Sequence, residues 1–251
     1  MQKLFVDFIP EDKIILNEEQ SRHISKSLRM KAGDMLTLSC QDGSDYGCII
    51  DEINSGIVTL SVCYKQANNS EPTVNVTIYQ GVPKGDKLED VIQKCTELGI
   101  SALCPVLTHR SVSRPDEKSA KKKQARYQKI ALEAAQQSGR GIVPEIMEMT
   151  SLKSAAENDT AQLKILFYEG GGEKLKDIIP DSVTSVSVYI GPEGGFEKEE
   201  VELLREKGAV IASLGPRILR TQTAPVAATT AIMLLTDNMK RFVSLNYSLS
   251  V

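Results

Sequence analysis

The sequence has no tryptophan, and aromatic residues of all kinds make up only 5% of its 251 residues. A hydrophobic core must therefore be built mainly from aliphatic side chains. No stretch approaches the roughly 20 consecutive apolar residues of a membrane-spanning helix. The first residues, MQKLFVDFIPEDK, lack the basic start and long apolar block of a signal peptide. These absences predict a cytoplasmic protein with no membrane partner.

Histidine and cysteine are too sparse and too scattered for a metal centre or a disulfide framework. There are 2 histidines and 5 cysteines, and no two cysteines lie close together in the sequence. We interpret the cysteines as small hydrophobic residues and expect no bound metal. The sequence also lacks a G-x-S-x-G motif and a histidine placed to activate a nucleophile. A group transfer that depends on orientation fits these absences better than hydrolysis or covalent catalysis does.

The chain divides into two parts of different pattern. Residues 1–66 hold short strand-like runs with turn signals close between them, and one helix-like piece, NEEQSRHISKSLRM. This pattern predicts a small β-barrel. The polar segment QANNSEPT, residues 66–73, has no periodicity and is expected to be a linker. We therefore expect one domain over residues 1–68 and a second over residues 74–251.

In the second part, strand-like and helix-like runs alternate. The expected strands are VNVTIYQG, ISALCPVL, KILFYE, SVSVYIG and VIASLG, and the expected helices are DKLEDVIQKCTELG, KKKQARYQKIALEAAQQSG and EKEEVELLREKG. Asp86 is expected to cap the first of these helices, and Gly99 and Gly139 to end the first two. This alternation predicts an α/β domain with a mostly parallel sheet and helices on both faces.

Glycine-containing segments follow three of the predicted strands. They are Gly170–Gly172, the stretch GPEGGF at residues 191–196, and Gly215 with Pro216. Ligands of open α/β sheets bind beyond the carboxyl ends of the strands, and glycine lets the backbone approach a ligand closely. None of the segments is a Walker loop or a G-x-G-x-x-G cradle. A plain strand-to-helix turn remains the alternative for GPEGGF.

A long apolar helix is expected at roughly residues 223–236, with Thr221 as its cap. Apolar residues lie on nearly all sides of this segment, so it is expected to be buried on more than one side. Burial in the core and burial at a dimer interface both fit the pattern.

Basic residues gather in two places although the net charge is −3. The first domain contributes Arg22, Lys26, Arg29 and Lys31. Lys118, Lys122, Arg126 and Lys129 recur at helical spacing and share one helix face. A solvated face and a polyanion-binding face both fit, and RNA is the polyanion that we favour.

Four ordered motifs, PKGDKLEDVIQKCTELGI, EAAQQSGR, IGPEGGF and LGPRILRTQTAP, resemble the ribosomal RNA small-subunit methyltransferase E family. The stretch HISKSLRMKAGD is similar to the PUA-like domain of that family. The resemblance implies a SPOUT-type α/β methyltransferase domain with a C-terminal trefoil knot and a small N-terminal PUA-like β-barrel. It also implies S-adenosyl-L-methionine as cofactor and a homodimer. The implied reaction is methylation of N3 of a specific uridine in small-subunit (16S) ribosomal RNA, and the substrate is either the free RNA or the 30S subunit.

The resemblance also assigns residues to roles. The three strand-end segments would hold the cofactor through Phe167, Glu169, Gly170, Ile190, Gly191, Pro192, Glu193, Gly194, Gly195, Leu214, Gly215, Ile218, Leu219, Arg220 and Thr223. The residues expected to contact RNA are Arg22, Lys26, Arg29, Lys84, Arg110, Lys122 and Arg126. The family usually has glutamate where this chain has Gln222, which hydrogen-bonds but carries no charge.

A guanidinium beside uracil O2 or O4 would stabilise the anion formed when N3 loses its proton. The candidates for this catalytic role are Arg220 and Arg140, the latter reaching across a dimer, and Glu193 is a weaker candidate for proton acceptor. The alternative function is a non-enzymatic RNA-binding or ribosome-assembly protein, which would not need the three strand-end segments.

Overall fold

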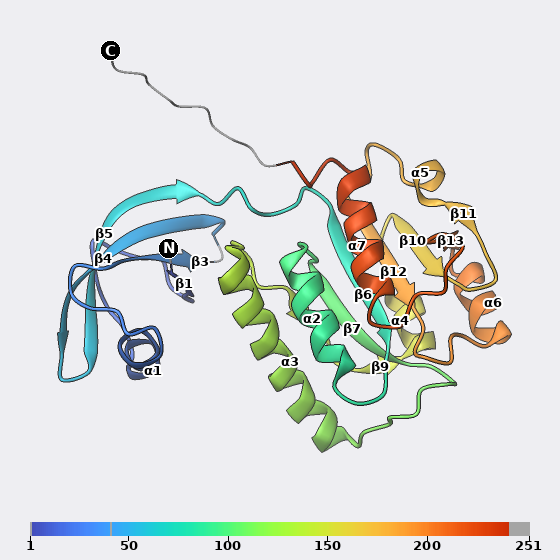
Figure 1. Cartoon of the computed structure of the whole chain (residues 1–251), viewed down its shortest axis with the longest axis horizontal. Helices are drawn as coiled ribbons and strands as arrows, with labels where there is room; N and C mark the ends of the chain where they lie inside the picture. The colour runs from blue at the N-terminus through green and yellow to red at the C-terminus, as the bar shows by residue number, and fades with distance from the viewer. Residues whose placement is uncertain (1, 41, 241–251) are drawn as a thin grey trace, which may run out of the picture.

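The computed structural model describes residues 2–40 and 42–240. It contains a five-stranded sheet at the N-terminus and an eight-stranded sheet in the rest of the chain (Figure 1). Among the described helices, none is long and apolar enough to cross a membrane.

The N-terminal sheet has the strand order β1-β3-β4-β5-β2. Its strands are β1 (Gln2–Phe5), β2 (Lys13–Ile15), β3 (Met35–Cys40), β4 (Ser44–Asn54) and β5 (Ile57–Ala67). The short helix α1 (Glu18–Arg22) and the π-helical turn η1 (His23–Ser27) lie beside the sheet and contribute Ile24 to its aliphatic core. The expected barrel is only partly formed: β1 and β2 are the two edges, and no ladder in the described part of the chain joins them. Both strands are too short to supply a long ladder.

The second sheet is parallel throughout, as the alternating pattern predicts. Its order is β11-β13-β10-β12-β6-β7-β8, and β9 pairs with β7. Its strands are β6 (Asn75–Gly81), β7 (Ala102–Leu107), β8 (Glu145–Ile146), β9 (Thr150–Ser151), β10 (Leu163–Phe167), β11 (Glu173–Lys174), β12 (Ser185–Ile190) and β13 (Ala209–Ser213).

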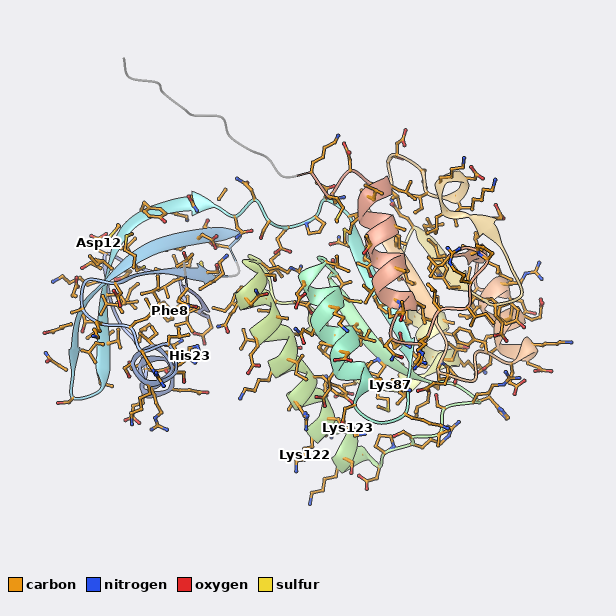
Figure 2. The ribbon with its side chains drawn as sticks, viewed as in Figure 1. Phe8, Asp12, His23, Lys87, Lys122 and Lys123 are labelled. Carbon is orange, nitrogen blue, oxygen red and sulfur yellow. The ribbon has the colours of Figure 1, made fainter. Side chains whose placement is uncertain are left out.

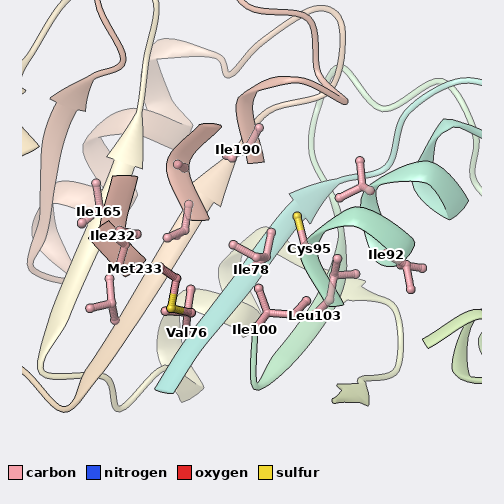
Figure 3. Close-up of a cluster of buried hydrophobic side chains, with 14 of the residues drawn as sticks. Val76, Ile78, Ile92, Cys95, Ile100, Leu103, Ile165, Ile190, Ile232 and Met233 are labelled. Carbon is pink, nitrogen blue, oxygen red and sulfur yellow. The ribbon is translucent and has the colours of Figure 1, made fainter. Parts of the chain in front are cut away.

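Helices cover both faces of this sheet. They are α2 (Lys87–Glu97), α3 (Glu117–Ser138), α4 (Leu152–Asn158), α5 (Leu175–Ile178), α6 (Lys198–Glu206) and α7 (Ala224–Leu235). Because side chains alternate along a strand, Ile78 lies on the face of the sheet that α2 and α7 cover, in the same buried cluster as Ile92 and Ile232 (Figure 3). Tyr79 belongs to the opposite face, with residues of α4 and α6.

Two expected helix caps are wrong in detail. The side chain of Asp86 does not cap α2; instead its backbone carbonyl accepts a hydrogen bond from the amide of Glu89 at 3.0 Å. Helix α7 begins at Ala224, three residues after Thr221, with Pro225 in its first turn. Proline is favoured there because it has no amide hydrogen to leave unpaired. The Thr221 side chain is therefore available for a different contact.

Helix α7 is buried on one side, where Ala228, Ile232 and Met233 are inaccessible. Leu234 and Leu235 at its C-terminal end are exposed. Core burial is thus confirmed for one side of the helix, and a dimer contact on its other side stays a prediction.

Candidate active site

The segments that follow β10, β12 and β13 meet at one edge of the sheet. These strands are neighbours and run parallel, so their carboxyl ends lie at the same edge. Residues from the three segments line a cavity of about 840 Å³. A volume of this size accommodates a cofactor or a nucleoside-sized molecule.

Most of the residues assigned to cofactor binding line this cavity. Those in the lining are Phe167, Glu169, Ile190, Gly191, Pro192, Glu193, Gly195, Leu214, Gly215, Ile218, Leu219 and Arg220. Gly170, Gly194 and Thr223 were also assigned but are not part of the lining. The sequence interpretation missed several lining residues, among them Lys87, Tyr168, Phe196, Arg217, Thr221 and Gln222.

Close packing of backbone explains the glycines around GPEGGF. A Cβ atom on Gly81, at the end of β6, would lie 2.5 Å from Cδ and 2.6 Å from the backbone nitrogen of Pro192. A Cβ atom on Gly191 would lie 3.0 Å from the backbone of Gly195. Gly195 itself has φ +70°, which L-residues rarely adopt. Larger residues at these positions would push the segment out of its place in the cavity wall.

A polar network joins β6, β12 and the segment before α7. The hydroxyl of Thr221 donates a hydrogen bond to the carbonyl oxygen of Gly191 at 2.9 Å. The side-chain amide of Gln80 donates to the Thr221 hydroxyl at 3.0 Å and to the Gly81 carbonyl at 3.0 Å. Gln80 is fully buried. Since buried hydrogen bonds restrict the groups that make them, this network fixes the relative positions of three chain segments at the cavity.

Glu193 is held by positive charge and backbone amides. Its carboxylate is 2.6 Å from the ammonium of Lys87 and 3.3 Å from the backbone nitrogen of Lys84. Burial raises the pKa of Glu193, but the hydrogen bonds from Lys87 and from backbone amides outweigh it and leave the pKa below its ordinary value. A carboxylate that is ionised and already hydrogen-bonded is a poor proton acceptor. This geometry therefore favours a structural role for Glu193.

Arg110 lies against the same loop. Its guanidinium donates to both carboxylate oxygens of Glu197, at 2.8 and 3.0 Å, and to the carbonyl of Gly194. The hydrogen bond from Arg110 is the main reason why the pKa of Glu197 is lowered. In this position Arg110 supports the end of GPEGGF.

The two arginines proposed for catalysis lie in different surroundings. Arg220 is exposed, lines the cavity, and makes no ion pair or side-chain hydrogen bond to any other described residue. Arg140 is buried and lies outside the lining. Its guanidinium donates to the carboxylate of Glu71 at 2.6 Å and to the carbonyl of Ile100 at 2.6 Å. Arg140 is thus committed to contacts within the chain, and of these two arginines only Arg220 has a guanidinium without a partner among the described residues.

The residues assigned to RNA contact are all exposed, on two parts of the molecule. Arg22, Lys26 and Arg29 lie on or just after α1 and η1, and Lys122 and Arg126 lie on α3. Arg126 is paired with Glu89 at 2.8 Å, as Arg110 is with Glu197. Arg22, Lys26, Arg29, Lys84 and Lys122 form no ion pair with another described side chain, so their charges face solvent.

The cavity has the chemistry that S-adenosylmethionine requires. Phe167, Ile190 and Leu214 offer apolar surface for a flat base, and glycine-containing backbone offers amides and carbonyls for its polar edge. The buried side-chain oxygen of Gln222, also in the lining, has no hydrogen-bond partner among the described residues. An unpaired buried acceptor is costly, and a donor from a ligand would relieve that cost. The residues present therefore fit the cofactor.

Comparison with known proteins defines the class of this fold and cavity. A family model described as an RNA methyltransferase domain matches residues 69–233, and one described as an RNA methyltransferase PUA domain matches residues 16–63. The chain is thus an α/β RNA methyltransferase domain joined to a PUA-like domain.

Similarity to individual proteins identifies the family to which the chain belongs. The chain is 36% identical to the ribosomal RNA small subunit methyltransferase E of Bacillus subtilis, over 96% of this chain and 99% of that protein. It is similar to the crystal structure of the Neisseria gonorrhoeae enzyme of that name bound to S-adenosyl methionine (TM-score 0.87, 27% identity, 94% of this chain and 98% of that one). A putative methyltransferase from Legionella pneumophila, also with the cofactor bound, has a TM-score of 0.85 and 29% identity over 92% of this chain and 96% of that one. The chain belongs to the ribosomal RNA small subunit methyltransferase E family.

Proposed function

We propose that the protein transfers a methyl group from S-adenosylmethionine to N3 of a uridine in small-subunit ribosomal RNA. The observation that carries the proposal is the cavity at the carboxyl ends of β10, β12 and β13, walled by the three segments that the family resemblance assigns to the cofactor. A protein that only binds RNA has no need of such a cavity beside an exposed, unpaired arginine.

The residues that would hold the cofactor form part of the cavity wall. The apolar side chains of Phe167, Ile190 and Leu214 would enclose the base, while the backbone of Gly191 and Gly215 would bind its polar groups. When bound, S-adenosylmethionine supplies an electrophilic methyl group and leaves as a neutral thioether. The task left to the chain is to orient the target base and to favour the nucleophilic form of N3.

Arg220 is the residue that we assign to that second task. Uracil N3 attacks as the anion, and a positive charge near O2 or O4 stabilises this form. The Arg220 side chain has no partner in the described structure that would compete for its five donors. Arg140 lacks this freedom because Glu71 and two backbone carbonyls occupy its guanidinium.

RNA would contact both parts of the chain. The exposed cations Arg22, Lys26 and Arg29 on the N-terminal part and Lys84 and Lys122 on the second part would bind phosphates. We divide the chain into a PUA-like RNA-binding domain at residues 1–68 and a methyltransferase domain at residues 74–251. The knotted C-terminal segment and the homodimer implied by the resemblance belong to the same proposal, and the exposed end of α7 at Leu234 and Leu235 suits the dimer contact.

The direct test is methylation of 30S subunits isolated from cells that lack this protein, followed by mass spectrometry of the RNA nucleosides. The expected product is 3-methyluridine, formed only with S-adenosylmethionine present. A methyl group on another atom would overturn the N3 assignment. Failure of the protein to bind S-adenosylmethionine in calorimetry would favour the non-enzymatic RNA-binding alternative.

The role of Arg220 is tested with Arg220→Ala. Turnover is expected to fall by about 100-fold or more, because one preorganised charge in a site contributes on that scale, while cofactor affinity changes little. Arg205→Ala is the matched control, since Arg205 lies on the exposed face of α6 and, among the described residues, pairs only with Glu202. Near-normal turnover of Arg220→Ala would rule out the assignment.

A further inference from the structure

A buried cluster of charged residues joins the N-terminal sheet to the α/β part of the chain. We call Lys3, Asp45, Glu71 and Arg140 the junction cluster. The ammonium of Lys3, on β1, lies 3.0 Å from both carboxylate oxygens of Asp45, on β4. It also donates to the carbonyl oxygens of Gly139 at 3.0 Å and Arg140 at 2.9 Å, the two residues that directly follow α3. The Lys3 side chain is only 7% exposed and that of Asp45 10%.

The Lys3 ammonium is thus placed on the carboxyl end of the longest described helix. The carbonyl groups at that end carry partial negative charge and have no partner within the helix. Gly139 is the C-cap residue of the helix and takes the left-handed conformation, with φ 77°, that glycine adopts without strain. The three donors of the Lys3 ammonium therefore meet the Asp45 carboxylate and two backbone carbonyls at the helix end, in a site that is mostly shielded from water.

Arg140 continues the cluster on the other side of the same helix end. Its guanidinium binds Glu71 in the linker, and Glu71 also accepts from the amide of Gly141 at 2.8 Å. Further bonds from Arg140 reach the carbonyls of Thr96 at 3.2 Å and Ile100 at 2.6 Å, just before β7. The N-terminal sheet, the linker and the end of α3 are therefore bonded to one another through two buried cations.

The cluster lies where the two parts of the molecule diverge. From the end of α3 at Gly139, the helix runs away toward Lys122 and Lys123, while α1 and His23 extend from the N-terminal sheet on the same side (Figure 2). Lys122 is seventeen residues before Gly139, or about 25 Å along the helix at 1.5 Å per residue. A 10° rotation at the junction would move Lys122 relative to the N-terminal sheet by about 4 Å. That displacement is large compared with the reach of a single phosphate contact.

We propose that Lys3 is a positioning residue for the RNA substrate: by binding the carboxyl end of α3, it fixes the distance between the basic residues of the N-terminal part and the cavity. The inference rests on the proposed function. Lys3 touches neither the cavity nor the exposed cations, so it acts only through the orientation of the two parts. The partner that requires this orientation is one RNA segment that binds Arg22, Lys26 and Arg29 while its target base enters the cavity.

The orientation itself is measured on the full chain with two spin labels. Cys63 is exposed on β5 and the other four cysteines are buried, so one label site is native. Glu202→Cys supplies the second site on the exposed face of α6. Lys3→Met is expected to broaden the distance distribution between the labels. Lys13→Met, an exposed lysine on β2 of the same sheet, is the control and is expected to leave the distribution unchanged.

The same variants are then assayed for methylation of 30S subunits. Lys3→Met is expected to raise the KM for the subunit on the order of tenfold or more, since small misplacements are costly. The kcat and the cofactor affinity are expected to stay within about twofold of wild type. A raised KM with an unchanged kcat is the kinetic signature of lost substrate binding. A fold defect alone would also weaken cofactor binding. If Lys3→Met is insoluble, Lys3→Met/Asp45→Asn makes the same test without an unpaired buried carboxylate.

Each outcome has one meaning. An unchanged distance distribution in Lys3→Met overturns the junction cluster as the device that fixes orientation. A broadened distribution with a wild-type KM overturns the positioning role. A broadened distribution with no methyl transfer by the wild-type protein overturns the proposed function and still supports the junction cluster.

Discussion

The hydroxyl of Thr221 and the carbonyl oxygen of Gly191 are 2.9 Å apart, although thirty residues separate them in the sequence. The bond joins the segment before α7 to the end of β12. Gln80, at the end of β6, donates to the same hydroxyl. The cavity is therefore held by bonds between its wall segments and not only by the packing of the sheet beneath it.

Replacing Thr221 with valine removes this bond, together with the acceptor of the Gln80 amide, and keeps the shape of the side chain. Thr221→Val is expected to weaken S-adenosylmethionine binding about fivefold, because a buried hydrogen bond contributes about 1 kcal/mol. Calorimetric titration measures the change. Thr230→Val is the control, since the one hydrogen bond of the Thr230 hydroxyl in the described part of the chain goes to the Val226 carbonyl within α7, at 2.8 Å. Equal affinities for wild type and Thr221→Val would show that the bond does not shape the site.

Gly81→Ala tests the close approach of β6 to Pro192. The new methyl group would overlap backbone as well as side-chain atoms, at 2.5 to 2.6 Å, so Pro192 must shift. We expect a loss of about 1–3 kcal/mol in the free energy of unfolding, together with at least tenfold weaker cofactor binding.

Gly208→Ala is the control that separates lost stability from lost cofactor binding. Gly208 has φ +87° at the end of α6 and no atom within 4 Å of an added Cβ. Alanine there is expected to cost about 1–2 kcal/mol of stability from backbone strain alone, with cofactor affinity unchanged. Urea unfolding measures the stability of both variants, and calorimetry measures their affinity for the cofactor. If Gly208→Ala also binds the cofactor more weakly, affinity simply follows stability.

The strands that build the cavity could be predicted because their apolar runs end abruptly at glycine-containing segments. β12 ends at Ile190, directly before Gly191, as the pattern indicates. The edge strand β2 has only three residues and leaves no such signal. The three wall segments could be placed for the same reason: each begins where a buried strand stops.

The contacts of a side chain could not be predicted where they depend on strand register or on a partner far away in the sequence. Gln80 lies opposite Ile190 in the β6–β12 ladder, and only that pairing brings it to Thr221. Arg140 looked available because it follows a helix in a recognisable motif. Its partner Glu71 is 69 residues away in the polar linker, where no pattern in the sequence indicates a buried acceptor.

The cysteines differ sharply in exposure, which predicts selective alkylation. Burial raises the pKa of Cys95 and of Cys104 to about 12, and burial with the nearby Cys63 raises that of Cys48 to about 11. Since the thiolate is the reactive form, iodoacetamide at pH 8 is expected to modify Cys63 alone in the native protein. Intact-mass spectrometry should show one adduct, and none in Cys63→Ser. Native modification of Cys95 or Cys104 would contradict the burial of these thiols.

The lowered pKa of Glu193 predicts how stability depends on pH. A carboxyl group whose pKa is lower in the folded state stabilises the fold above its unfolded pKa, near 4.5, and loses this contribution as pH falls through the folded value. The difference in unfolding free energy between wild type and Glu193→Gln should therefore be constant from pH 8 to 5.5 and shrink below about 4.5. It should not exceed about 1 kcal/mol, because the pair with Lys87 is partly exposed. Urea unfolding across this range measures it, with Glu157→Gln as the control for removing an exposed carboxylate, on α4. A difference that grows toward low pH would mean that Glu193 is protonated more readily in the folded state, and the role of Lys87 in holding it would be wrong.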